Sequence, residues 1–247
     1  MKIVCFRFYG ELKDLLDVNH RHGMVRHRFK GKQSLKDRVE SLGIPHTEIA
    51  MMLKGNNQLN FSYPVKDGDR ICVFPSSWQD IKLPREKNLQ PSPPPAMKFV
   101  LDCHLGKLAN FLRVLGFDTL YSNSFDDPEL AKIQEKEKRI LLTRDKGLLQ
   151  RRRVKWGCYL HSDSPRQQLR EVVIRYDLHD RMQEFGRCPG CNHTLENVSK
   201  EEIIDRLEPL TKKHYDSFKI CRSCDKIYWR GSHYEKLRSL VDDIKGN

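Results

Sequence analysis

The sequence lacks any apolar run that approaches the ~20 residues of a membrane-spanning helix. Its first residues, MKIVCFRFYG, lack the long apolar core of a secretion signal. A serine–histidine pair of the kind used in nucleophilic catalysis is not apparent either. We therefore expect a cytoplasmic protein with no membrane partner, and any catalysis is expected to depend on other groups.

Acidic residues are in short supply, with 33 against 45 basic ones, which gives a formal net charge of +12. The excess amounts to +6 in residues 1–97, +4 in residues 98–185 and +2 in residues 186–247. Charge spread along a whole chain is typical of proteins that lie along a polyanion. It favours a nucleic acid as the partner, although charge alone also fits an ordinary basic surface.

Eight cysteines occur, and four of them form two Cys-x-x-Cys pairs separated by 29 residues. The other four lie in or beside strand-like runs and are most simply core residues. Two such pairs predict one tetrahedral zinc site, which is structural because four thiolates leave no position for water. A redox dithiol or a disulfide is the alternative, but neither accounts for two pairs together. The predicted zinc ligands are Cys188, Cys191, Cys221 and Cys224.

Proline is concentrated in LPREKNLQPSPPPAM, residues 83–97, which holds five of the chain's twelve prolines. Because proline lacks a backbone donor and has a fixed φ, this segment is predicted to be an extended, semi-rigid linker. Composition changes again at Gly186, just before the cysteine pairs. We expect four parts: domain 1–82, linker 83–97, domain 98–185, and a zinc ribbon at 186–247 that ends in a basic tail.

The first segment has the element order of a β-grasp domain. Strands are predicted in KIVCFRFY, HRFKG, IAMMLK and DRICVFP, and a helix capped by Ser34 in SLKDRVESLGI. The segment resembles the ubiquitin-like sulfur carriers of the ThiS and MoaD type, notably in IAMMLKGNNQLNFSYPVKDGDRICVFP. Those carriers end in a free Gly-Gly carboxylate, whereas here Pro75 runs on into Ser76 and Ser77. We therefore expect a module that contacts a protein partner or RNA, and not a carrier.

The second segment alternates strands with helices, which predicts a parallel sheet covered on both faces. The strands are expected in KFVLD, DTLYS, RILLT and KWGCYLH. The helices are expected in LGKLANFLRVLG, DDPELAKIQEKEK, KGLLQRRR and SPRQQLREVVIRYDL. The expected fold class is α/β, with a β-grasp domain before the sheet and a zinc ribbon after it.

Aspartates follow all four strands of this segment: Asp102, Asp126 with Asp127, Asp145 and Asp163. In a parallel sheet these positions share one edge, because the carboxyl ends of all strands face the same way. Carboxylates gathered there repel one another unless a cation separates them. Mg²⁺ or Mn²⁺ suits such oxygen ligands and promotes phosphodiester hydrolysis. The pattern predicts a divalent-metal site at this edge.

Each aspartate also has a structural interpretation. Asp126 and Asp163 come just before prolines that open helices, and helix capping is the stronger interpretation for both. Asp145 has the alternative of a turn or of a pair with Arg144. For Asp102 and Asp145 we favour the functional interpretation, since two strands that end in aspartate at one edge need a common cause.

Three stretches make a resemblance to a known family specific: FVLDCHLGKLANFLRVLGFDTLY, DDPELA and RILLTRD, followed by the two cysteine pairs. In these respects residues 98–230 are similar to the Mut-seven C-terminal RNase family, a PIN-like nuclease domain fused to a zinc ribbon. A ubiquitin-like segment in front resembles the bacterial members. The resemblance implies divalent-metal-dependent hydrolysis of RNA. The acids it implies as catalytic residues and metal ligands are, in order of weight, Asp102, Asp145, Asp127, Asp126 and Asp163.

Basic and aromatic residues offer contacts for RNA. Lys107 and Arg144 lie near the aspartates in sequence and are suited to hold a phosphate. Others are candidates to follow the backbone or to stack on bases. The arginine run fits a solvated face as well, and the aromatic residues fit the core of a small ribbon. These further candidates are Arg113, Arg151, Arg152, Arg153, Lys155, Tyr228, Trp229 and Arg230.

The leading hypothesis is a metal-dependent ribonuclease in which aspartates act on RNA phosphodiesters and the zinc ribbon aids RNA binding. The alternative is a non-catalytic RNA- or ribosome-binding adaptor with the same fold. A sulfur-transfer partner is a third hypothesis, weakened by the missing Gly-Gly. The expected cofactors are structural Zn²⁺ and catalytic Mg²⁺ or Mn²⁺. The expected partner is RNA, with transfer RNA and ribosome-associated RNA as candidates.

Overall fold

The computed structural model describes residues 1–77, 87–183 and 185–245. Its contacts divide the chain into two compact units, Met1–Pro95 with Asp126–Tyr159, and Ala96–Phe125 with Leu160–Asn247. Residues of the predicted nuclease segment therefore occur in both units. Within the described ranges, no helix has the length and apolar character that a membrane crossing requires.

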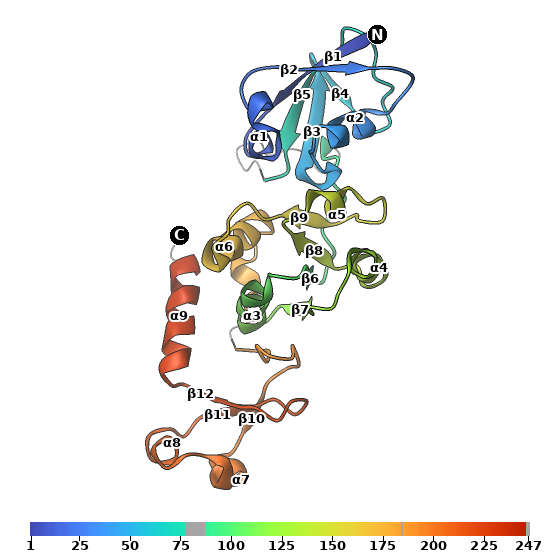
Figure 1. The fold of residues 1–247 in the computed structure, drawn as a ribbon. Helices are drawn as coiled ribbons and strands as arrows, with labels where there is room; N and C mark the ends of the chain where they lie inside the picture. Colours follow the sequence, from blue (N-terminus) through green and yellow to red (C-terminus); the bar gives the residue numbers. More distant parts are fainter. Residues whose placement is uncertain (78–86, 184, 246–247) are drawn as a thin grey trace. The chain divides into compact units, whose positions relative to one another are not determined.

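The N-terminal domain is a five-stranded mixed sheet with two short α-helices (Figure 1). Its elements are β1 (Lys2–Phe8), α1 (Leu12–Leu15), β2 (Val25–Phe29), α2 (Leu35–Ser41), β3 (Ile49–Lys54), β4 (Asn57–Leu59) and β5 (Arg70–Pro75). The strand order is β2-β1-β5-β3-β4, with β1 and β5 parallel and the other neighbours antiparallel. This arrangement confirms the predicted β-grasp architecture.

The sequence pattern of this domain explains its core. Alternate residues of β1, among them Val4 and Phe6, are buried together with Leu35 of α2. Ser34 caps α2 as predicted, since its hydroxyl accepts a hydrogen bond from the Asp37 backbone N–H at 3.2 Å. The Asp37 carboxylate in return accepts from the Ser34 backbone N–H, which completes a capping box.

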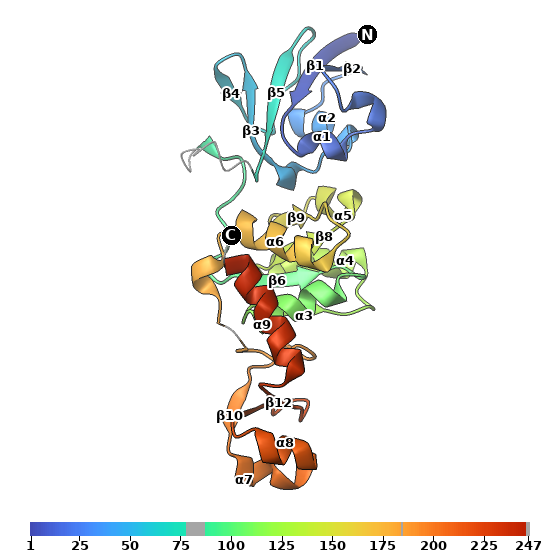
Figure 2. The ribbon, with the colours of Figure 1, turned by 90° about the vertical axis from the view of Figure 1, so that its left-hand side faces the viewer.

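The central domain is a four-stranded parallel sheet with helices. Its strands are β6 (Lys98–Leu101), β7 (Asp118–Tyr121), β8 (Ile140–Thr143) and β9 (Gly157–Tyr159). Its helices are α3 (Gly106–Val114), α4 (Asp127–Glu137), α5 (Lys146–Gln150) and α6 (Pro165–Arg175). The strand order is β7-β6-β8-β9, and α3 packs against α6 (Figure 2). The predicted α/β fold is confirmed.

The C-terminal part is a three-stranded antiparallel sheet followed by a helix. Its elements are β10 (Glu196–Val198), α7 (Lys200–Ile203), α8 (Pro209–His214), β11 (Phe218–Ile220), β12 (Ile227–Trp229) and α9 (Ser232–Lys245). Helices α7 and α8 lie in the long insert between the two cysteine pairs. The predicted basic tail is wrong. Residues 232–245 form helix α9, and residues 232–247 carry three basic and three acidic side chains.

The proline-rich linker is only partly described, because residues 78–86 lie outside the described ranges. From residue 87 to residue 97 it contains no strand or α-helix, as an extended linker should. It is nevertheless anchored to its own unit. The Leu89 backbone N–H donates to the Ala50 carbonyl at 2.8 Å, and the Gln90 side-chain amide donates to the His46 and Ile49 carbonyls at 2.6 Å.

The N-terminal domain also contacts the second half of the central domain within the same unit. The Tyr159 backbone N–H donates to the Glu48 carboxylate at 2.9 Å, and the Lys146 ammonium donates to the Leu15 carbonyl at 2.8 Å. The ring of Tyr159 packs against the β-grasp core. The module thus binds helix α5 and strand β9 of its own chain.

Candidate metal centre and active-site residues

The four predicted zinc ligands come together in the C-terminal part. The sulfur atoms of Cys188 and Cys224 are 3.6 Å apart, and those of Cys191 and Cys221 are 3.3 Å apart. All four sulfur atoms lie within 4.8 Å of one another. A tetrahedron with zinc–sulfur bonds of about 2.3 Å has edges of about 3.8 Å, and a disulfide would need about 2.05 Å. The donor set therefore fits a Cys₄ zinc site, and the disulfide alternative does not fit.

Two matching turns hold these cysteines. In the first, the Asn192 backbone N–H donates to the Cys188 carbonyl at 2.9 Å, and in the second, the Asp225 N–H donates to the Cys221 carbonyl at 2.8 Å. Asn192 and Asp225 have φ values of 72° and 57°. Asparagine and aspartate tolerate this left-handed conformation better than most residues. Each Cys-x-x-Cys pair is thus followed by a residue suited to close its turn.

The thiols have unequal proton affinities. Burial raises the pKa of Cys188, but hydrogen bonds with Tyr228, Cys191 and Cys224 outweigh it and lower that pKa to about 6. Burial and the neighbouring cysteines raise the pKa of Cys224 to about 12. One thiolate thus forms readily while its neighbours resist ionisation. A divalent cation resolves this conflict, because metal binding displaces the remaining protons.

Arg113 connects the cysteine turn to α3 and β7. Its predicted contact with RNA is therefore corrected to a structural contact. The side chain is only 5% exposed, and its guanidinium donates to the Thr119, Pro189 and Gly190 carbonyls at 3.0, 2.8 and 3.0 Å. These partners occupy donors that a phosphate would need. Arg113 therefore has a structural role.

Two of the predicted catalytic aspartates cap helices. Asp126 is the N-cap of α4, and its carboxylate accepts from the Glu129 N–H at 2.8 Å, which confirms the capping interpretation. Asp145 is the N-cap of α5, where one oxygen, Oδ1, accepts from the Gly147 and Leu148 N–H groups at 2.6 and 3.3 Å. The cap fixes the Asp145 carboxylate through one oxygen.

Asp127 forms an ion pair. Its Oδ2 lies 3.1 Å from Nη2 of Arg151, and both side chains are partly exposed. Arg153 lies 3.9 Å from Glu135, so this part of the arginine run faces acidic residues of α4. Helix α5 ends at Gln150. The run therefore follows the helix and does not extend it, contrary to the predicted helix KGLLQRRR.

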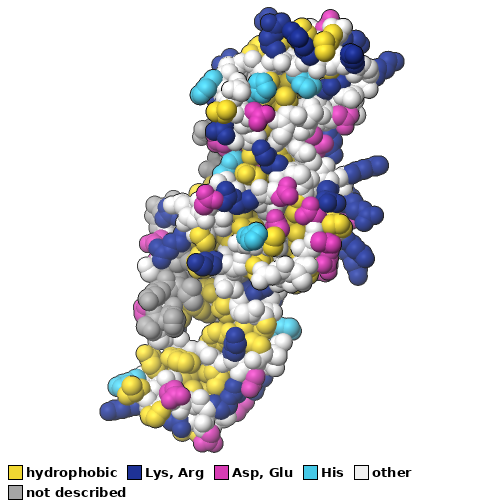
Figure 3. All heavy atoms as spheres, in the orientation of Figure 1, with side chains coloured by type: hydrophobic (Ala, Val, Ile, Leu, Met, Phe, Trp, Pro, Cys, Tyr) yellow, Lys and Arg dark blue, Asp and Glu magenta, His cyan; other side chains and the backbone are white. Residues whose placement is uncertain are grey.

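The remaining predicted residues lie at or beyond strand ends. Asp102 directly follows β6 and is half-buried, whereas Asp163 is exposed in the loop before α6, whose N-cap is Ser164. Lys107, in the first turn of α3, is exposed. The other exposed basic candidates are Arg144, Arg152, Lys155 and Arg230. Figure 3 shows lysine and arginine side chains over the N-terminal, central and C-terminal parts of the chain.

The cysteines are the only group of at least three possible ligand residues within 4.8 Å of one another in the described part of the chain. The aspartates do not meet that criterion there. A divalent ion at the aspartates therefore stays a prediction. Its physical basis is that Asp102 and Asp145 each lie just beyond the carboxyl end of a strand, β6 and β8 respectively.

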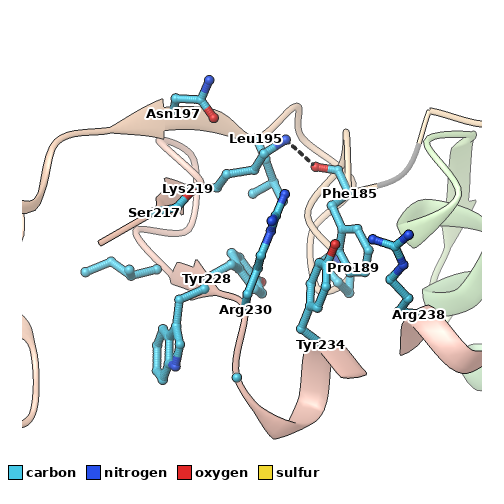
Figure 4. Close-up of a pocket in the computed structure, with 13 residues that line it drawn as sticks. Phe185, Pro189, Leu195, Asn197, Ser217, Lys219, Tyr228, Arg230, Tyr234 and Arg238 are labelled. Atoms are coloured by element: carbon cyan, nitrogen blue, oxygen red, sulfur yellow. Dashed lines mark hydrogen bonds between the residues drawn. The ribbon is translucent and has the colours of Figure 1, made fainter. Parts of the chain in front are cut away.

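Sequence reasoning missed a cavity in the C-terminal part (Figure 4). Its volume is about 640 Å³, and its lining includes Trp229 and Arg230, which the sequence had indicated. It also includes Phe185, Lys219 and Tyr234, which the sequence had not. The mixture of aromatic and basic residues in CRSCDKIYWRGSHYEKL was the available signal. It was incomplete, because Phe185 and Lys219 lie outside that stretch.

Fold and metal centre together define a class of protein: a ubiquitin-like domain, a parallel α/β domain, and a ribbon with a four-cysteine site. Residues 97–241 match the family described as the Mut7-C RNAse domain, and residues 1–80 match the Mut7-C ubiquitin family. The chain therefore belongs to the Mut7-C RNase family, and the resemblance found in the sequence is confirmed. This membership indicates a ribonuclease. Comparisons with curated proteins and with solved structures gave no match.

Proposed function

We propose that the protein is a divalent-metal-dependent ribonuclease, with aspartates at the carboxyl ends of its parallel strands as metal ligands. The observation that carries this proposal is the match of residues 97–241 to an RNase domain family. The strand ends support it, because Asp102 and Asp145 each directly follow a strand, or lie one residue beyond it, at its carboxyl end. The strand ends of a parallel sheet are where ligands of such folds bind.

The chemistry of the donor set fits Mg²⁺ or Mn²⁺. Asp102, Asp127 and Asp145 offer hard carboxylate oxygens, and each side chain is at least partly accessible. A bound ion would supply a water of lowered pKa and neutralise charge on the phosphate. Asp102, Asp127 and Asp145 are the residues that would hold the ion, and the cap engages the Asp145 carboxylate through Oδ1.

Arg151 has a second role in this proposal. Without an ion it neutralises Asp127, and the pair is partly exposed, so its strength is modest. If Asp127 held the ion, the Arg151 guanidinium would be available to bind an RNA phosphate. Lys107 and Arg144 are further candidates for phosphate contacts, and Asp163 is the weaker fourth acid.

The test is cleavage of a mixed pool of structured and single-stranded RNAs by zinc-loaded protein, with added Mg²⁺ or Mn²⁺ and without it. Asp102→Asn and Asp145→Asn should each lose cleavage but keep RNA binding. Asparagine also caps helices well, so Asp145→Asn removes charge while it preserves the start of α5. Asp126→Asn is the matched control, because it changes a capping aspartate that carries little weight as a ligand, and it should stay active.

One observation favours the non-catalytic adaptor as a second candidate. Asp126 and Asp145 cap helices, and Asp127 pairs with Arg151, so these three carboxylates have structural partners. For an adaptor, no protein should cleave RNA under any ion condition, while wild type and all three variants should bind it equally. That result would overturn the nuclease proposal and leave the carboxylates as structural groups.

A further inference from the structure

The cavity in the C-terminal part is built by β11, β12, the start of α9 and residue 185 (Figure 4). Its volume of about 640 Å³ lies within the usual range of small-ligand sites. The zinc ligands themselves do not line it, although Pro189 of the first cysteine turn does. Tyr228, which also lines the cavity, hydrogen-bonds the Cys188 sulfur at 3.0 Å, so the cavity adjoins the metal centre. None of the candidate aspartates lines it.

Aromatic rings form part of its wall. The rings of Phe185 and Tyr234 stack with their centroids 4.3 Å apart and an angle of 30° between their planes. Trp229 is 39% exposed. Gly231 lets the indole lie close against the backbone, since a Cβ there would lie 2.9 Å from the Trp229 indole nitrogen. Exposed rings of this kind provide flat surfaces for stacking.

Positive charge accompanies these rings. Lys219, Arg230 and Arg238 line the cavity, and none of its described lining residues is acidic. The Arg230 guanidinium carbon lies 5.6 Å from the centre of the Tyr234 ring, and Figure 4 shows both side chains at the cavity. The Lys219 ammonium donates to the Phe185 carbonyl at 2.9 Å, which fixes it at the rim. Arg238 also pairs with Asp242, whose carboxylate oxygen lies 3.7 Å from its Nε. Aromatic surface beside the Arg230 guanidinium complements a base and its phosphate.

We infer that this cavity binds one unpaired base of an RNA strand, stacked on its aromatic wall, with an adjacent phosphate on Arg230. The inference rests on one part of the proposed function, namely that RNA is the nucleic acid that this protein binds. A base in a duplex is paired and stacked, so it cannot enter such a cavity without leaving the helix. The ribbon would thus direct the protein to single-stranded or bulged RNA.

The experiment measures binding by fluorescence anisotropy, with zinc-loaded full-length protein and no Mg²⁺ or Mn²⁺. The probes are fluorescein-labelled oligouridine, an abasic ribose-phosphate strand of the same length, and a blunt RNA duplex. Oligouridine should bind about tenfold more tightly than the abasic strand, which is the effect expected of one stacked base. Trp229→Ala and Arg230→Gln should remove most of that preference, and Trp229→Phe should retain it.

Arg222→Gln is the matched control, because Arg222 is an exposed arginine of the same ribbon outside the cavity lining. It should weaken binding of all three probes alike through charge. Equal binding of oligouridine and the abasic strand, or equal effects of Arg230→Gln and Arg222→Gln, would overturn the inference. If Trp229→Ala loses zinc, Trp229→Phe and Arg230→Gln decide the matter.

The binding assay contains no catalytic ion, so it separates this inference from the proposed function. A preference for bases in a protein that never cleaves RNA would refute the nuclease and keep the cavity assignment. Ion-dependent cleavage without any preference for bases would support the nuclease and refute the cavity assignment.

Discussion

Asp69 is a buried carboxylate that stabilises the N-terminal domain. It is 2% exposed and accepts hydrogen bonds from the Lys54 ammonium at 2.6 Å, the Lys66 backbone N–H at 2.8 Å and the Tyr63 hydroxyl at 3.2 Å. Burial alone would raise the pKa of Asp69, but these donors together outweigh it and hold the pKa below its ordinary value. Asp69 therefore favours the folded state in its charged form.

The first prediction concerns pH. Because the pKa is lower in the folded state, the stabilisation by Asp69 is complete above the unfolded pKa, at about 4, and is lost as pH falls through the folded pKa. Asp69→Asn should lower the free energy of unfolding at neutral pH by about 1–3 kcal/mol and flatten its decline below about pH 4. Urea unfolding at a series of pH values measures this. A variant with the same acid-side slope as wild type would contradict it.

Single residues also show which site roles could be predicted from the sequence and which could not. The four zinc ligands were predictable because their spacing alone carries the signal. Arg113 was misassigned, because its carbonyl partners Pro189 and Gly190 lie more than seventy residues away in the sequence. The cap that Asp145 provides for α5 was missed, although the helix that follows Asp145 was predicted.

At the scale of elements, strong local patterns were predicted well and weak ones were not. Helix α2 was found from its capping box, and the four strands of the central sheet from their apolar runs. Strand β4 was not among the predicted elements, because its pairing with β3 defines it and its residues are mostly polar. Helix α9 is an exception: it was not predicted, although Tyr234, Leu237, Val241 and Ile244 follow helical spacing.

The second prediction concerns the ribbon. Its sheet and insert bury a small cluster of only five apolar residues, so folding should depend on the metal. Wild type should hold one zinc per chain, and Cys191→Ser should retain much less. Removal of zinc should expose residues 186–230 to limited proteolysis, while residues 1–77 stay protected. Equal protection of the ribbon with and without zinc would contradict the structural role.

At the scale of the whole molecule, the unexpected feature is that the N-terminal module contacts its own chain. Glu48 is 1% exposed and accepts the Tyr159 backbone N–H, although the two residues are more than a hundred positions apart. Further hydrogen bonds join Gln150 to Glu40 and His46 to Val154. The sequence predicted the two folds separately, but it contains no local signal for contacts of this range.

The third prediction follows from that contact. Glu48→Ala leaves the Tyr159 N–H without this acceptor, which costs about 1–3 kcal/mol when the group is buried. Hydrogen exchange should therefore accelerate at residues 157–160 as well as around residue 48. Glu48→Gln keeps an acceptor and should change exchange at β9 less. Faster exchange confined to the N-terminal domain would show that the contact does not stabilise β9.

The measurement that most directly tests the central claim is Mn²⁺ binding, followed by electron paramagnetic resonance on zinc-loaded protein. It needs no knowledge of the RNA substrate. Wild type and Asp126→Asn should bind Mn²⁺ in competition with Mg²⁺, whereas Asp102→Asn and Asp145→Asn should bind it about tenfold more weakly or worse, because each lacks a charged ligand. Equal Mn²⁺ binding by all four proteins, or none by wild type, would contradict the metal site at the strand ends.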